Sequence, residues 1–155
     1  MTGYTKAGLN HNEARTEEQK SLMAKIEADG VCPFCEEHFR QYHPKPILKE
    51  TTSWFFTENM SPYEGTTQHF IFVYKPSHIR FPSELSTEAR AELFNLIDWA
   101  IEEYEIQGGS FFMRFGEGGY TGSSVEHLHA HLISGEEKSN DTEGLKVKLS
   151  YKKIS

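Results

Sequence analysis

The chain has 155 residues, of which 37% are hydrophobic and 13% aromatic, and this is enough for one domain with a substantial core. Its 23 acidic and 16 basic side chains give a formal net charge of −7, which argues against a broad basic surface for nucleic acid or an anionic membrane. No apolar run approaches the length of a membrane span, and residues 1–20 lack the apolar core of a secretion signal, so we expect a cytoplasmic protein.

The first part of the chain divides into a polar arm and a helix. Residues 1–15 are polar, and we expect them to form a flexible arm in front of a single domain that spans residues 16–155. Thr16-Glu17-Glu18-Gln19 has the form of a capping box, which predicts a helix that begins there and runs to about Asp29. Gly30 follows as a natural stop for this helix.

The chain has two cysteines, Cys32 and Cys35, in the sequence Cys-Pro-Phe-Cys directly after the predicted helix. In a reducing compartment this spacing indicates a metal site or a redox pair in place of a structural disulfide. A redox pair of the thioredoxin type would lie between a strand and a long helix. Here a helix precedes the motif and residues 36–43 allow only a turn or two, so a metal site is favoured.

The rest of the chain contains predicted strands, loops and one long helix. Pro44 and Pro46 indicate an extended connection. Ser86-Thr87-Glu88 caps a helix that runs to about Ile106, and we expect its apolar residues at helical spacing in the core, namely Leu93, Ile97, Ala100, Ile101 and Tyr104. Apolar, aromatic or β-branched runs predict strands over residues 52–57, 68–74, 110–115, 125–133 and 144–153. Because strands and helices do not alternate regularly, we predict an α+β domain with an antiparallel sheet.

The most informative segment is His127-Leu128-His129-Ala130-His131, in which three histidines alternate with apolar residues. On a strand, alternate side chains share a face, so the three imidazoles would lie together and the apolar residues would face the core. Side chains that titrate near neutral pH suit chemistry on an anionic substrate. Two simpler interpretations are a polar strand face that happens to be histidine and a metal site formed by all three histidines.

This segment follows Gly122-Ser123-Ser124-Val125, and the chain also holds Cys32-x-x-Cys35 and Lys75-Pro76-Ser77-His78. Together these motifs resemble the histidine triad family of nucleotide hydrolases and transferases, over about residues 32–133. The resemblance implies a five-stranded antiparallel sheet with one long helix, to which this chain adds an N-terminal helix and a zinc knuckle. It also implies a homodimer, for which the helix over residues 86–106 is a candidate pairing surface, although its apolar face could equally cover its own sheet.

The resemblance assigns roles to the motif residues. His129 would attack phosphorus and form a nucleotidyl-histidine, and His131 would contact the phosphate or protonate the leaving group. The turn at Gly122, Ser123 and Ser124 could place backbone N–H groups and a hydroxyl on phosphate oxygens, although such a loop could also be a plain hairpin connection. A closed structural Zn²⁺ site would take four ligands, namely Cys32, Cys35, His78 and His127. Zinc on all three triad histidines would leave the other three ligands without a role.

Further residues are candidates for holding the nucleoside. Asn59 could bind the ribose hydroxyls, although it also suits a turn. Phe34 could form one wall of an apolar nucleobase slot, and Phe55 or Phe56 another. His69 is expected to be a hydrogen-bonding histidine behind the site or in the core. Two departures from the family pattern affect the leaving-group side: Gly116 stands where many relatives have Asn, and the loop over residues 62–69 is longer.

The sequence therefore predicts a hydrolase that cleaves a phosphoanhydride or phosphoramidate bond of a nucleotide, in a dinucleoside polyphosphate or a nucleoside phosphoramidate. A nucleotidyl-histidine is the expected intermediate, and a nucleotide small molecule the expected partner, with no nucleic acid and no membrane. A third histidine at His131, where nucleotidyltransferases of the family have Gln, favours hydrolysis. The alternatives are a dinucleoside polyphosphate phosphorylase or nucleotidyltransferase, and a zinc-stabilised nucleotide-binding module without turnover.

Overall fold

The computed structural model describes residues 17–155. The arm predicted over residues 1–15 and the capping residue Thr16 lie outside these described residues. Residues 17–155 contain three helices, α1 (Glu17–Asp29), α2 (Glu36–Tyr42) and α3 (Thr87–Glu103). Five strands follow the order β1 (Ile47–Glu50), β2 (Trp54–Glu58), β3 (Gln68–Tyr74), β4 (Ser110–Arg114) and β5 (His129–Ser134) along the chain, with short 3₁₀ turns at Pro82–Glu84 and Gly118–Tyr120.

The strands form one antiparallel sheet in the order β1-β2-β3-β5-β4. In β5 the register pairs His129 with Val73 of β3 on one side and with Arg114 of β4 on the other. The predicted α+β class, with a five-stranded antiparallel sheet and one long helix, is confirmed. The strand that carries the histidines is next to last in the sheet, so it has hydrogen-bonded neighbours on both sides.

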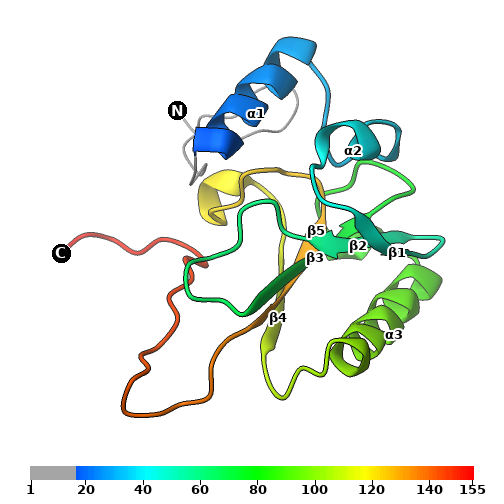
Figure 1. The fold of residues 1–155 in the computed structure, drawn as a ribbon. Coiled ribbons are helices and arrows are strands. Elements are labelled where there is room, and N and C mark those ends of the chain that lie inside the picture. The colour runs from blue at the N-terminus through cyan, green and yellow to red at the C-terminus, as the bar shows by residue number, and fades with distance from the viewer. Residues whose placement is uncertain (1–16) are drawn as a thin grey trace.

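One face of the sheet packs against α3, which Figure 1 shows alone on that side. Ser86 caps this helix because its hydroxyl accepts a hydrogen bond from the N–H of Ala89. Trp54 of β2 donates its indole N–H to the carbonyl of Ala89 at 2.8 Å, which fixes the helix to the sheet. The apolar core between them contains Phe56, Phe70, Phe72, Leu93, Leu96, Ile97, Ala100, Leu128, Ala130 and Leu132.

The apolar face of α3 is therefore occupied by its own sheet, and pairing with a second chain stays a prediction. One residue expected in this core, Ile101, is 39% exposed. Phe94, also on α3, is 56% exposed and lies edge-on to Phe111 of β4, with ring centroids 5.5 Å apart.

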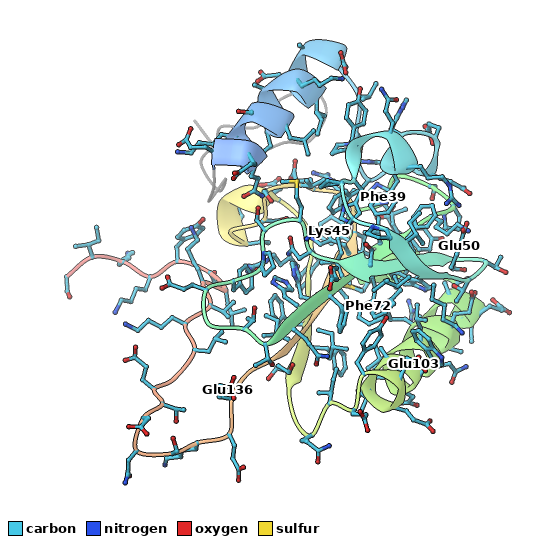
Figure 2. All side chains as sticks on the ribbon, viewed as in Figure 1. Phe39, Lys45, Glu50, Phe72, Glu103 and Glu136 are labelled. Atoms are coloured by element: carbon cyan, nitrogen blue, oxygen red, sulfur yellow. The ribbon has the colours of Figure 1, made fainter. Side chains whose placement is uncertain are left out.

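The opposite face of the sheet is covered by α1 and α2, which lie together on the other side of the sheet in Figure 1. Phe39 of α2 stacks on Phe55 of β2 with ring centroids 4.7 Å apart, and Figure 2 labels Phe39 on this side, away from α3. Met23 and Ile26 of α1 pack with Tyr42. The alternation of side chains along β5 sends Ala130 and Leu132 toward α3, so His129 and His131 face the side that α1 and α2 cover.

Three sequence-based strand assignments need correction. The strand predicted over residues 144–153 is wrong, because this segment has no strand pairing and its Leu149 and Tyr151 are exposed. The fifth strand is β1, in the segment interpreted as an extended connection, where it pairs with β2 at the edge of the sheet. The histidine strand is also shorter than predicted, since β5 begins at His129 and His127 lies just before it. Within residues 17–155, no helix has the length and apolar character needed to cross a membrane.

Candidate active site

Four side chains from three distant segments meet beside the sheet. Cys32 and Cys35 come from the loop between α1 and α2, His78 from the turn after β3, and His127 from the residues before β5. Their candidate ligand atoms all lie within 4.8 Å of one another. Nδ1 of His127 is 3.6 Å from Sγ of Cys32, 3.7 Å from Sγ of Cys35 and 3.3 Å from Nδ1 of His78.

These separations fit a tetrahedral metal. Zinc bonds of about 2.3 Å to sulfur and about 2.0–2.1 Å to nitrogen place sulfur and nitrogen ligands about 3.6 Å apart and two nitrogen ligands about 3.3 Å apart. Nε2 of His127 lies 2.6 Å from the carbonyl oxygen of Tyr74, which can only accept, so the ring proton is on Nε2 and Nδ1 offers its lone pair to the cluster. The four residues therefore form a donor set that fits one Zn²⁺ with no open position.

The pKa values of the two thiols do not favour a redox nucleophile. Burial, followed by the neighbouring Cys32, raises the pKa of Cys35 to about 12, and burial also raises the pKa of Cys32. Reactive cysteines have a lowered pKa, because the thiolate is the nucleophile. The pair therefore lacks the lowered pKa of a redox nucleophile, and the metal site stays the favoured prediction.

His129 is buried and held in one tautomer. Its Nδ1 lies 2.6 Å from the carbonyl oxygen of His127, so Nδ1 carries the proton and donates it, and Nε2 keeps its lone pair. Burial lowers the pKa of His129 to about 4, and the positive charge of Arg114 acts in the same direction, so the imidazole is neutral at pH 7. A neutral imidazole with one lone pair is a nucleophile.

His131 is connected to a second histidine behind the site. The backbone N–H of Tyr63 donates to Nδ1 of His69 at 3.1 Å, and Nδ2 of Asn59, which can only donate, lies 3.0 Å from Nε2 of the same ring. This Nε2 is also 2.8 Å from Nδ1 of His131, so a proton on either of these two nitrogens would be shared between the two rings. His69 is thus a buried hydrogen-bonding partner of His131.

His129 and His131 open onto one cavity under α1 and α2, and their ring centroids are 5.0 Å apart. Phe34, expected as a nucleobase wall, lines this cavity and meets His129 edge-on at 5.0 Å. Phe55 and Phe56 belong to the packed cores on the two sides of the sheet and are not among the residues that line the cavity.

The predicted phosphate turn also lines the cavity. Gly122 has φ of +73°, a backbone conformation that glycine adopts without strain. The hydroxyl of Ser123 donates to the carbonyl of Val125 at 2.6 Å, so it stabilises the turn itself. The hydroxyl of Ser124 accepts from Nε2 of Gln19 at 3.4 Å, which connects the turn to α1.

Asn59 lies at the cavity, and its amide already has contacts within the protein. Its Oδ1 accepts from the N–H of Ser61 at 3.0 Å, and its Nδ2 is 3.0 Å from Nε2 of His69. Its predicted contact with ribose stays a prediction, and any such contact would share the amide with this network.

Several residues that line the cavity were not predicted from the sequence. Among them are Gln19, Leu22, Met23 and Ile26 of α1, Tyr42 and His43 at the end of α2, Tyr63, and Arg114 of β4. Arg114 could have been noticed in the sequence, since it is a charged residue within the otherwise largely apolar run over residues 110–115. The role of the α1 residues could not be predicted from the sequence, because an apolar helix face does not show whether it covers a core or a cavity.

The fold matches several solved structures. A hypothetical histidine triad nucleotide-binding protein from Sulfolobus tokodaii strain7 is 19% identical with a TM-score of 0.54, and the match covers 79% of this chain and 82% of that one. A histidine triad nucleotide-binding protein from Candida albicans is 13% identical with a TM-score of 0.52, over 73% of this chain and 82% of that one. The chain has the histidine triad fold.

A third structure with the histidine triad fold is a Zn-bound histidine triad family protein from Mycobacterium smegmatis. It is 14% identical with a TM-score of 0.50, and the match covers 72% of this chain and 77% of that one.

Comparison by sequence gives a different kind of relative. No family model matches the chain. A 94-residue segment is 31% identical to a probable mannitol dehydrogenase of Medicago sativa, over 57% of this chain and 24% of that protein. The chain thus spans about a quarter of the length of that relative, and the activity in its name does not carry over to the histidine triad fold seen here.

Proposed function

We propose that the protein is a nucleotide hydrolase of the histidine triad type, which cleaves a phosphoanhydride or phosphoramidate bond through a nucleotidyl-histidine intermediate. The observation that carries this proposal is the hydrogen bond of 2.6 Å from Nδ1 of His129 to the carbonyl of His127. This hydrogen bond keeps the ring proton on Nδ1, so the lone pair of Nε2 is available to attack phosphorus. His131 lies beside His129 in the same cavity, where it could act as the general acid.

The reaction has two balanced steps. Nε2 of His129 attacks phosphorus and forms the N–P bond as the bond to the leaving group breaks, and His131 in its doubly protonated form gives a proton to the leaving group and becomes neutral. Water then attacks the same phosphorus, the N–P bond breaks, and His131 takes a proton from the water. The products are a nucleoside monophosphate and the protonated leaving group. The backbone N–H of Ser124 would bind a phosphate oxygen, whereas those of Gly122 and Ser123 already donate to the carbonyl of Gly118 and to Oγ1 of Thr121.

We further propose that the nucleoside binds in the same cavity, beside Phe34 and Asn59. Phe34 offers a flat apolar surface edge-on to His129, which suits a nucleobase without strong selection among bases. Asn59 offers amide groups at the cavity for the ribose diol. A homodimer and a cytoplasmic location complete the hypothesis.

We propose that Cys32, Cys35, His78 and His127 hold one structural Zn²⁺. Bound there, the ion would supply no reactive water, because all four positions are filled by protein ligands. Its effect would be to fix the loop between α1 and α2 against His127, whose carbonyl holds the proton of His129. The donor set and its tetrahedral spacing support this proposal.

The covalent step is testable with a radiolabelled nucleotide. Wild-type protein mixed with diadenosine triphosphate or adenosine 5′-phosphoramidate, each labelled at the phosphorus next to adenosine, should yield an acid-labile labelled protein after rapid denaturation. His129→Ala should lose this label and several orders of magnitude in turnover, while it still binds AMP. His38→Gln, which removes a histidine of α2 outside the cavity, is the matched control and should keep both.

Other outcomes identify the alternatives. Full turnover in His129→Ala would contradict the covalent mechanism. A nucleoside diphosphate that forms only when inorganic phosphate is added would identify a phosphorylase. AMP binding without turnover of either substrate by the wild-type protein would identify a binding module.

A further inference from the structure

The cavity contains one cation that the proposed reaction does not use. Arg114 lies on β4, directly opposite His129 of β5 in the sheet register, so the two side chains are on the same face. It is only 9% exposed and lines the cavity together with His129 and His131. Arginine is almost never buried unless it is paired with an anion.

Among the described residues, the groups that Arg114 contacts are all neutral. One nitrogen, Nη1, donates to the carbonyl of Thr121, and the other, Nη2, donates to the hydroxyl of Tyr63 at 2.8 Å. The guanidinium carbon also lies 5.2 Å from the centroid of the Phe112 ring, a weaker contact. None of the ion pairs found over residues 17–155 includes Arg114.

These contacts leave both charge and hydrogen-bonding capacity for a ligand. A guanidinium has five N–H groups, and the two hydrogen bonds above use two of them. A buried charge without a counter-charge is costly, so an anion entering the cavity would relieve that cost. The planar fork of arginine suits the oxygens of a phosphate.

The position of Arg114 indicates which phosphate it meets. Its Nη1 lies 3.6 Å from where a Cβ atom on Gly122 would be, so one edge of the guanidinium borders the phosphate turn. Its other edge is held by Tyr63, whose ring stacks near His131 with centroids 5.9 Å apart and planes inclined by 20°. The guanidinium therefore spans from the phosphate turn to the side of His131, where the leaving group would depart.

We propose that Arg114, held by Tyr63, binds a phosphate of the leaving group, so that the enzyme selects nucleotides whose leaving group is a phosphate chain over those whose leaving group is a neutral amine. This inference rests on the proposed nucleotide hydrolase function and narrows its substrate class to phosphoanhydrides, dinucleoside polyphosphates among them. Tyr63 acts as a positioning residue, because its hydroxyl touches the guanidinium and its backbone N–H orients His69.

The test compares two substrates that share the transferred adenylyl group. Diadenosine triphosphate carries a polyphosphate leaving group, whereas adenosine 5′-phosphoramidate releases ammonia. In Arg114→Gln we expect kcat/KM to fall about a hundredfold for the triphosphate, the usual effect of losing a positioned charge-stabilising donor, and to change by less than about threefold for the phosphoramidate. Arg114→Lys should fall between wild type and Arg114→Gln on the triphosphate, because it keeps the charge and loses the fork.

Two further variants keep the test decisive. Tyr63→Phe removes the hydroxyl that Nη2 contacts and should show a smaller loss with the same selectivity for the triphosphate. Arg90→Gln removes an arginine of α3 outside the cavity and should leave both substrates unchanged. Thermal melting and zinc content of each variant identify any that fails to fold, in which case Tyr63→Phe decides.

Equal losses on both substrates in the folded variants would overturn the inference, because Arg114 would then act on the transferred phosphoryl group or on the fold. Unchanged kinetics on both would overturn it as well. A wild-type protein that turns over neither substrate would instead refute the proposed function, and this inference would fall with it.

Discussion

Replacing Cys35 by serine should lower the free energy of unfolding by about 5 kcal/mol if the cysteine–histidine cluster holds zinc. Serine is a poor zinc ligand, so the variant would lose the ion and with it the link between distant parts of the chain. Cys35 and His127 are 92 residues apart, and the entropy of closing a loop of this length corresponds to about 5 kcal/mol. For a domain of this size the loss should lower Tm by about 10–20 °C.

The measurement is thermal unfolding followed by circular dichroism, with metal analysis of the same samples. Wild-type protein should contain one zinc per chain, and a strong chelator should lower its Tm to near that of Cys35→Ser. The variant itself should be insensitive to the chelator. His38→Gln, which removes a nearby histidine outside the cluster, should keep both zinc and the wild-type Tm. Carefully purified wild-type protein without zinc, with a Tm that the chelator does not change, would refute the reasoning.

Two more predictions concern Asn59 and His43. Asn59→Ala should bind a ribonucleotide about tenfold more weakly, or about 1.4 kcal/mol, and its deoxy counterpart equally well in a competition titration; an unchanged ribose preference would show that Asn59 serves only its own turn. Burial lowers the pKa of His43 from 6.5 to about 4, so the unfolded chain takes up this proton at a higher pH than the folded chain. The stability that depends on neutral His43 should be complete above pH 6.5 and decrease by about 3 kcal/mol toward pH 4. In urea unfolding, wild type should lose that much relative to His43→Gln, and a difference independent of pH would contradict the assignment.

The long elements could be predicted because their apolar pattern is strong. The β3 run Gln68–Tyr74 and the helix α3 appear close to their expected bounds. The alternating segment over residues 144–153 shows where prediction from sequence fails. Alternation indicates that a segment could form a strand, but it does not show that the segment pairs with the edge of a sheet. The edges of this sheet are β1 and β4. The strand β1 has only four residues, and its pairing with β2 decides its structure more than its own sequence does.

The site could be predicted where chemistry depends on side chains close in sequence or on a recognisable spacing. Cys32 and Cys35, and the triad His127–His131, are patterns of this kind. The atoms that fix the imidazoles are not, because a carbonyl such as that of Tyr74 belongs to every residue and only the fold brings it to Nε2 of His127. The pairing of His69 with His131 likewise depends on the register between β3 and β5.

Of the two departures from the family pattern expected from the sequence, one meets Arg114 and the other does not. Gly116 has φ of +80°, which glycine adopts without strain, and a Cβ atom there would lie 3.2 Å from the ring of Phe81, which is not among the residues that line the cavity. The lengthened loop over residues 62–69 contributes Tyr63, whose hydroxyl accepts from Arg114. This loop therefore helps to hold a cation in the cavity beside His131. A substrate with a charged leaving group would make use of that cation, which is why the comparison of a phosphoanhydride with a phosphoramidate is the most informative experiment on this protein.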